Sequence, residues 1–144
     1  MNCIWFNKDV SLETLEQSLT GTMAENLDME WEEIGDNYLR MKMPVTDKSR
    51  QPYGILHGGA SCALAETIGS IGSHLVIDNT RFRCVGLEIN ANHVSAVNEG
   101  IIYAIAKPLH LGRSTHIWDI RITSGPGKLV CVSRLTVAIL EKQG

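Results

Sequence analysis

The chain has 144 residues, which suits a single domain with its own hydrophobic core. Its 13 Lys and Arg and 16 Asp and Glu are mixed along the sequence and leave a formal net charge of −3. This charge pattern predicts neither a nucleic-acid partner nor a membrane partner. No run approaches the roughly 18 to 20 apolar residues of a membrane span, and the first ten residues do not resemble a leader. We therefore expect one domain over residues 1–144, located in the cytoplasm.

Four cysteines are widely separated, at Cys3, Cys62, Cys84 and Cys131. They show neither a C-x-x-C pair nor the spacing of zinc ligands. Reduced thiols in a cytoplasmic protein are therefore expected, with no metal centre.

The first predicted element is a short helix that begins after Ser11, a good N-cap residue, and runs to Ser18 with leucines at helical spacing. From Met29 the apolar residues alternate instead. Two antiparallel strands are expected there, joined by a turn at residues 35–37 and ended by Pro44.

One long helix is predicted from Gly58 to Ile77, about 30 Å at 1.5 Å per residue. Four strand-like runs follow, separated by glycine-containing turns, at residues 84–94, 101–107, 116–123 and 129–140. The order of elements indicates an α+β fold in which a curved antiparallel sheet wraps around the long helix.

Alternation predicts which strand residues face this helix. In the third strand one face would carry Val85, Leu87, Ile89, Ala91 and His93. In the fifth strand it would carry His116, Trp118, Ile120 and Ile122, with His116 as a core histidine. The helix would meet the sheet through Leu64, Ile68, Ile71 and Leu75.

Glu66 lies opposite this apolar stripe, among small residues that include Cys62, Ala63, Ser70 and Ser73. It could simply face water, as in any amphipathic helix. However, it is the only Asp, Glu, Lys or Arg between residues 54 and 77. A helix face so poor in charge suggests that a ligand or a second chain covers it. Burial of that face would desolvate Glu66 and raise its pKa, as suits a general base or nucleophile.

The residues at the start of the helix could supply the second part of such a site, the groups that polarise a carbonyl. Unpaired N–H groups at Gly58 and Gly59 could hold a polarised carbonyl oxygen, or the two glycines could serve only a tight turn. His57 could orient a ligand or merely begin the helix. Ser70, one turn beyond Glu66, could hold the carboxylate or pack as a small residue.

Three segments, QPYGILHGGASCALAETIGS, VGLEINANH and KPLHLGR, resemble the hotdog-fold acyl-CoA thioesterases of the Arthrobacter-type 4-hydroxybenzoyl-CoA thioesterase branch. Within that branch the chain is most similar to the 1,4-dihydroxy-2-naphthoyl-CoA hydrolases of menaquinone synthesis and the proofreading thioesterases of enterobactin synthesis. The resemblance covers about residues 27–140. It implies a sheet around one long helix, no metal or redox cofactor, and homodimers with shared active sites that commonly pair into homotetramers.

The same motifs imply roles for single residues. Glu66 would be the catalytic base or nucleophile, Gly58 would bind the carbonyl oxygen, Gln51 and His57 would orient the acyl group, and Ser70 would position the carboxylate or water. Coenzyme A contacts are implied for Gly86, for His93, Val94, Ser95 and Ala96, and for His110, Leu111, Gly112, Arg113, Ser114 and Thr115.

The chain departs from the family where an arginine often follows N-H-V, because Ser95-Ala96-Val97 stands there instead. Arg113 could provide a phosphate contact or be an ordinary exposed charge. His74 matches no family role, and the segment from Cys3 to Lys8 is unlike the plainer starts of relatives.

The resulting hypothesis is hydrolysis of acyl-CoA thioesters, with aromatic acyl groups such as 1,4-dihydroxy-2-naphthoyl preferred. One alternative is a proofreading thioesterase that clears misloaded aryl carrier proteins. A second is a module that binds acyl-CoA without cleaving it.

Overall fold

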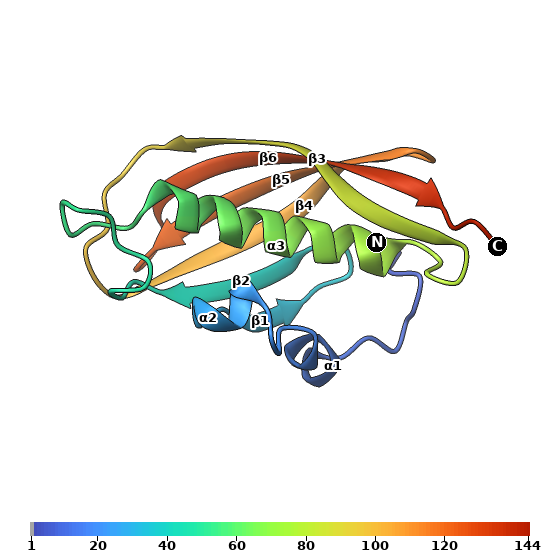
Figure 1. The fold of residues 1–144 in the computed structure, drawn as a ribbon, viewed down its shortest axis with the longest axis horizontal. Helices are drawn as coiled ribbons and strands as arrows, with labels where there is room; N and C mark the ends of the chain where they lie inside the picture. The colour runs from blue at the N-terminus through green and yellow to red at the C-terminus, as the bar shows by residue number, and fades with distance from the viewer. Residues whose placement is uncertain (1) are drawn as a thin grey trace.

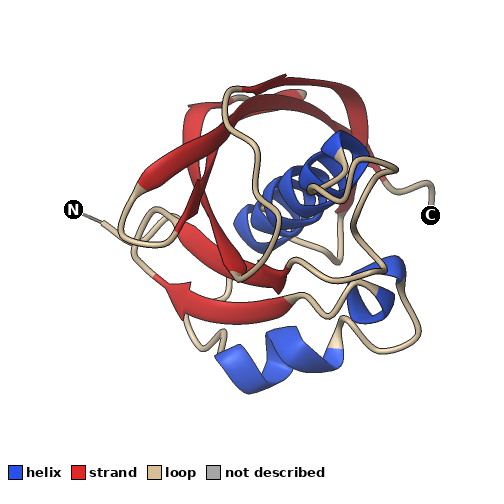
Figure 2. Cartoon of the chain, turned by 90° about the vertical axis from the view of Figure 1, so that its left-hand side faces the viewer, coloured by secondary structure: helices blue, strands red, loops and turns tan. Residues whose placement is uncertain are grey.

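The computed structural model describes residues 2–144, and in this part of the chain six strands form one antiparallel sheet curled around the long helix α3 (Figures 1 and 2). The strand order across the sheet is β1-β2-β4-β5-β6-β3. The expected α+β class is confirmed. In chain order the elements are α1 (Leu12–Gln17), α2 (Met23–Asn26), β1 (Glu30–Ile34), β2 (Leu39–Pro44), α3 (Gly58–Val76), β3 (Phe82–His93), β4 (Ile101–Leu111), β5 (Thr115–Ser124) and β6 (Lys128–Glu141).

The N-terminal elements follow the sequence pattern closely. Ser11 is the N-cap of α1, and its hydroxyl accepts a hydrogen bond from the Thr14 N–H at 3.2 Å. β1 and β2 form the expected hairpin. The short helix α2 was not predicted, because four residues carry too little periodicity to reveal a helix.

β4 is longer than expected. It continues past Pro108 to Leu111, whereas the prediction ended this strand at residue 107. The missing N–H of Pro108 is tolerated for a positional reason. β2 pairs with β4 only as far as Ala106, so Pro108 lies beyond the end of β2 and pairs only with Trp118 of β5, at an edge position where Pro is tolerated. A register shift between Pro108 and His110 then carries the strand on beside β5.

The prediction that Val85 and Leu87 share a face with Ile89 is wrong. A β-bulge between Gly86 and Glu88 inserts one extra residue opposite β6 and shifts the alternation. Val85 and Leu87 are therefore exposed, at 42% and 61%, while Gly86 faces α3. In β5 the predicted face is correct, and all four of its members are buried.

Helix α3 packs on the sheet through Leu64 and Ile68, which are fully buried, and through two glycines. A Cβ on Gly72 would lie 2.8 Å from the ring of Trp118, so the helix sits close to β5. Ile71 and Leu75 are only partly buried. Ser73, predicted beside Glu66, instead points into the core and hydrogen-bonds Trp118.

Within residues 2–144, none of the helices combines the length and the hydropathy required to cross a lipid bilayer.

Candidate active site

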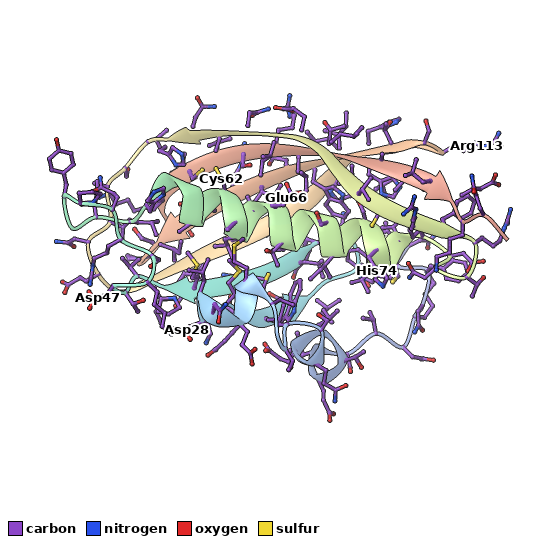
Figure 3. All side chains as sticks on the ribbon, in the orientation of Figure 1. Asp28, Asp47, Cys62, Glu66, His74 and Arg113 are labelled. Carbon is purple, nitrogen blue, oxygen red and sulfur yellow. The ribbon has the colours of Figure 1, made fainter. Side chains whose placement is uncertain are left out.

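Glu66 lies in a groove of about 420 Å³, hereafter the Glu66 groove, whose floor is the exposed side of α3. The floor is made of small residues around the carboxylate, namely Gly59, Cys62, Ala63 and Thr67. One wall is β3, from Gly86 to Ile89, and Met23 of α2 forms the other. Because large side chains are missing from the floor, a ligand can approach the carboxylate closely. Figure 3 shows Glu66 midway along α3.

The Glu66 carboxyl is partly buried, and this desolvation raises its pKa above the ordinary value. A hydrogen bond from the Ser70 hydroxyl opposes the effect by stabilising the ionised form. Burial, reinforced by the nearby Glu66 charge, also raises the pKa of the Cys62 thiol, which makes that thiol a poor nucleophile. The carboxylate is thus the group in this groove suited to act as a general base.

Gly86 is the closest neighbour of this carboxylate on the sheet. A Cβ built at Gly86 would overlap Oε1 of Glu66, so only glycine leaves room for the carboxylate in this position. The resemblance implied a coenzyme A contact for Gly86. Here it also shapes the space around the predicted catalytic group, which sequence spacing alone does not reveal.

At the N-terminus of α3, a second pocket of about 320 Å³, the helix-start pocket, brings together Gln51, Gly58 and His93. The ring of His93 packs so tightly on Gly58 that a Cβ there would lie 2.8 Å from Nε2. The side-chain oxygen of Gln51 accepts a hydrogen bond from the Tyr53 N–H, so the amide nitrogen is the end that can donate to a ligand.

His57 is the N-cap of α3, and its Nδ1 accepts a hydrogen bond from the Gly59 N–H at 2.7 Å. In the neutral ring the proton therefore resides on Nε2, which becomes a donor. The Gly58 N–H, in contrast, has no acceptor within residues 2–144. An unpaired N–H at the positive end of a helix dipole is suited to binding a carbonyl oxygen that gains negative charge.

The residues predicted to contact coenzyme A divide into separate groups. His93, Val94, Ser95 and Ala96 line the helix-start pocket. His110 to Thr115 lie at the turn between β4 and β5, where Gly112 N–H donates to Thr115 O. Figure 3 places Arg113 at the right-hand end of the sheet, beyond Glu66 and far from the start of α3. Within one chain the structure does not bring Arg113 to either pocket.

Two histidines received no role in the site from the sequence, His116 and His74. His116 is buried, and its Nδ1 is 3.0 Å from the Ser73 hydroxyl, so it is a core histidine. His74 is exposed on the last turn of α3. Among residues 2–144, no group of three or more His, Cys, Asp and Glu is arranged to bind a metal ion.

Sequence reasoning assigned no site role to several residues that line the Glu66 groove. Met23 lies outside every quoted motif, and Leu87, Glu88 and Ile89 lie within VGLEINANH without a predicted role. Only the packing of α2 and β3 along α3 brings them to the carboxylate.

Comparison with known proteins shows which family the chain is similar to. A family model described as the thioesterase superfamily matches residues 53–131. The 1,4-dihydroxy-2-naphthoyl-CoA hydrolase of Escherichia coli is 47% identical over 137 residues, covering 95% of this chain and 99% of the relative. The proofreading thioesterase EntH of Cronobacter turicensis is 42% identical and covers 95% and 98%, respectively.

The fold has a close match among solved structures. The crystal structure of a mutant thioesterase from Pseudomonas aeruginosa superposes with a TM-score of 0.94 at 41% identity, covering 96% of this chain and 99% of that one. The curved sheet around one helix is therefore the hotdog fold of these thioesterases.

Proposed function

This chain belongs to the thioesterase superfamily, and we propose that the acyl-CoA thioesters it hydrolyses carry an aromatic acyl group such as 1,4-dihydroxy-2-naphthoyl. The observation that carries the proposal is the partly desolvated Glu66 in a groove floored by small residues. The hydrolase of Escherichia coli, 47% identical, supports the choice of acyl group and a place in menaquinone biosynthesis. The cytoplasmic location expected from the cysteines stays a prediction.

The reaction needs a base and a carbonyl-polarising group, and the two pockets can supply them. As general base, Glu66 takes a proton from water whose oxygen attacks the thioester carbon. The carbonyl oxygen gains charge against the Gly58 N–H, the C–S bond breaks, and coenzyme A leaves as the thiol after taking a proton. Alternatively, the Glu66 carboxylate attacks the carbon directly and water hydrolyses the resulting anhydride. Gln51 and His57 would orient the acyl group, and Ser70 would hold the carboxylate.

The distance between the two groups supports a site shared between two copies of the chain. Gly58 and Glu66 are eight residues apart on one helix, which corresponds to about 12 Å along its axis. Reacting atoms must approach to about 3 Å, so a carbonyl held at one Gly58 is out of reach of the same chain's Glu66. A partner's α3 running alongside would supply the missing half. β3, the last strand of the sheet, offers an open edge for joining two copies.

Such a dimer would also account for the separation, within one chain, of the residues predicted to contact coenzyme A. The turn that carries Arg113 is far from its own helix-start pocket, so it would contact a nucleotide bound mainly to another copy. Pairing of dimers into a tetramer is part of the same proposal.

The test is Glu66→Gln, assayed by release of free coenzyme A from a panel of benzoyl, hydroxynaphthoyl and aliphatic thioesters. We expect kcat to fall by at least about a hundredfold, as for other catalytic bases. Glu88→Gln removes an exposed carboxylate from the wall of the same groove and is the matched control. In the wild type, kcat/KM should fall as the pH drops through the raised Glu66 pKa, because protonation removes the base. Near-normal turnover by Glu66→Gln would refute the assignment.

A second candidate is hydrolysis of misloaded aryl carrier proteins, favoured by the 42% identity with EntH. Assaying hydroxynaphthoyl-CoA and a mischarged aryl carrier protein side by side separates the two. A higher kcat/KM on the carrier protein would support the second candidate.

A further inference from the structure

The helix-start pocket lies between two stretches of chain that are distant in sequence. One wall comes from the loop before α3 and contains Gln51 and Leu56. The second wall is the end of β3 with the segment that follows it, from His93 to Ala96. The groups that join these two walls therefore control where the Gln51 amide lies in the pocket.

The first wall is a narrow turn with two arms. The Gln51 arm, residues 49–51, pairs with the arm at residues 55–57, which leads into α3. The Gln51 N–H donates to Ile55 O at 2.8 Å. The His57 N–H donates to Ser49 O at 2.7 Å. At the tip, Tyr53 is 91% exposed, so little packing holds this end of the turn.

The main chain joins one arm of the turn to the second wall. Leu56 N–H donates to Val97 O at 2.7 Å, just beyond the part of the second wall that lines the pocket. Within residues 2–144, no backbone hydrogen bond joins residues 46–51 to residues 93–100. A direct link between the Gln51 arm and the second wall must therefore come from a side chain.

The Arg50 side chain makes this link. Its Nε and Nη2 both donate to Asn98 O, at 3.2 and 3.0 Å. Its Nη1 donates to Asp47 Oδ1 at 2.7 Å, but this carboxylate is fully exposed, so the ion pair contributes little to stability. Figure 3 shows Asp47 at the same end of the molecule as the start of α3. Because hydrogen bonds from a charged donor are stronger than neutral ones, the contact with Asn98 O is the one that holds the Gln51 arm.

We propose that Arg50 is a positioning residue, which holds the Gln51 arm against the second wall and so places the Gln51 amide beside a thioester carbonyl bound at the Gly58 N–H. Because Arg50 directly precedes Gln51, any movement of its backbone also moves the Gln51 side chain. A displacement of about 1 Å can cost about a hundredfold in rate, so we expect the contact to affect kcat. This inference rests on the proposed function, since it requires Gln51 to orient the acyl group.

The first test removes the guanidinium. In Arg50→Met we expect kcat for hydroxynaphthoyl-CoA to fall about tenfold, with KM within about threefold of the wild type and an unchanged urea midpoint. Arg50→Lys keeps the charge without the planar fork, so it should restore part of the lost kcat. Lys48→Met is the matched control, because this exposed neighbour pairs with Asp28 instead. Asp47→Asn should also keep its kcat, since the contact with Asn98 O remains.

A double-mutant cycle separates positioning from a general loss of structure. If Arg50 acts through Gln51, Arg50→Met should lower kcat about tenfold in the wild type but less than about twofold in Gln51→Ala, which has no amide to place. Equal losses in both backgrounds, an unchanged kcat in Arg50→Met, or full activity of Gln51→Ala would each overturn the inference. A wild-type enzyme that releases coenzyme A from none of the thioesters in the panel would instead refute the proposed function.

Discussion

The partial desolvation of the Glu66 carboxylate depends on the small residues around it. Gly59 and Ala63 on its own helix and Gly86 on β3 leave the carboxylate partly shielded from water, and no cation within residues 2–144 forms an ion pair with it. The sequence predicted this environment from the lack of other charges between residues 54 and 77. It did not predict that Gly86 sets the position of the carboxylate, because that contact joins a helix and a strand 20 residues apart.

Gly86→Ala tests the role of this contact. The added Cβ would overlap Oε1 of Glu66 and displace the carboxylate, and a misplacement of about 1 Å can cost about a hundredfold in rate. We expect kcat to fall at least tenfold. Stability should be kept, because Ala in a strand is generally favoured over Gly by about 0.5–1 kcal/mol.

The measurements are thiol release and urea denaturation. Asn90→Ala, at an exposed position of the same strand, is the control. Turnover of Gly86→Ala within twofold of the wild type would show that the carboxylate does not need this space.

At the scale of elements, the contact between α3 and β5 fixes how the helix lies on the sheet. The Ser73 hydroxyl accepts a hydrogen bond from Trp118 Nε1 at 2.8 Å, so its own proton is available for His116 Nδ1. Burial, with a smaller contribution from the charge of His110, lowers the pKa of His116. The folded state therefore holds this histidine neutral.

A pH dependence of stability follows from this buried histidine. Below the ordinary His pKa of about 6.5 the unfolded chain binds a proton that the folded chain does not, so stability falls as the pH drops from there to the lowered folded-state pKa. In His116→Gln, which cannot titrate at this position, we expect a smaller loss of unfolding free energy as the pH drops below about 6.5. Urea denaturation at several pH values measures this slope, and a slope equal to that of the wild type would contradict the prediction.

The elements themselves could be read from the sequence where a local pattern specifies them. Ser11 with its leucines gave α1, and the alternation in β5 gave its buried face. Two predictions failed because pairing with a neighbouring strand decided the outcome. The bulge at Gly86 turned Val85 and Leu87 outward, and the end of β2 freed β4 to continue past Pro108.

At the scale of the whole molecule, one folded chain holds the two halves of the predicted site in separate pockets. Glu66 is in one, and Gln51 with Gly58 is in the other. If the active site is shared, each site combines Glu66 of one copy with Gln51 and Gly58 of the other. Two chains with different defects could then rebuild one intact site.

Mixing Gln51→Ala and Glu66→Ala chains tests this arrangement. After unfolding and refolding together, half of the dimers would be mixed and each would contain one intact site, so we expect about one quarter of wild-type activity. Glu66→Ala mixed with the double variant Gln51→Ala/Glu66→Ala cannot rebuild a site and is the control. A mixture no more active than its components would place the whole site within one chain.

The sequence by itself determined the order of every element except α2, the long helix with its lone carboxylate, and the motif that marks Glu66, Gln51, His57, Gly58 and Ser70, because helical and strand periodicity and short motifs are local properties. Tertiary structure decided the rest. Gly86 meets Glu66, Ser73 turns into the core, and side chains between Phe6 and Ser18 line a pocket beside His74. Each of these contacts joins residues that no local pattern connects. The space available around the carboxylate depends on how the elements pack, and packing is decided only when the sheet curls around α3.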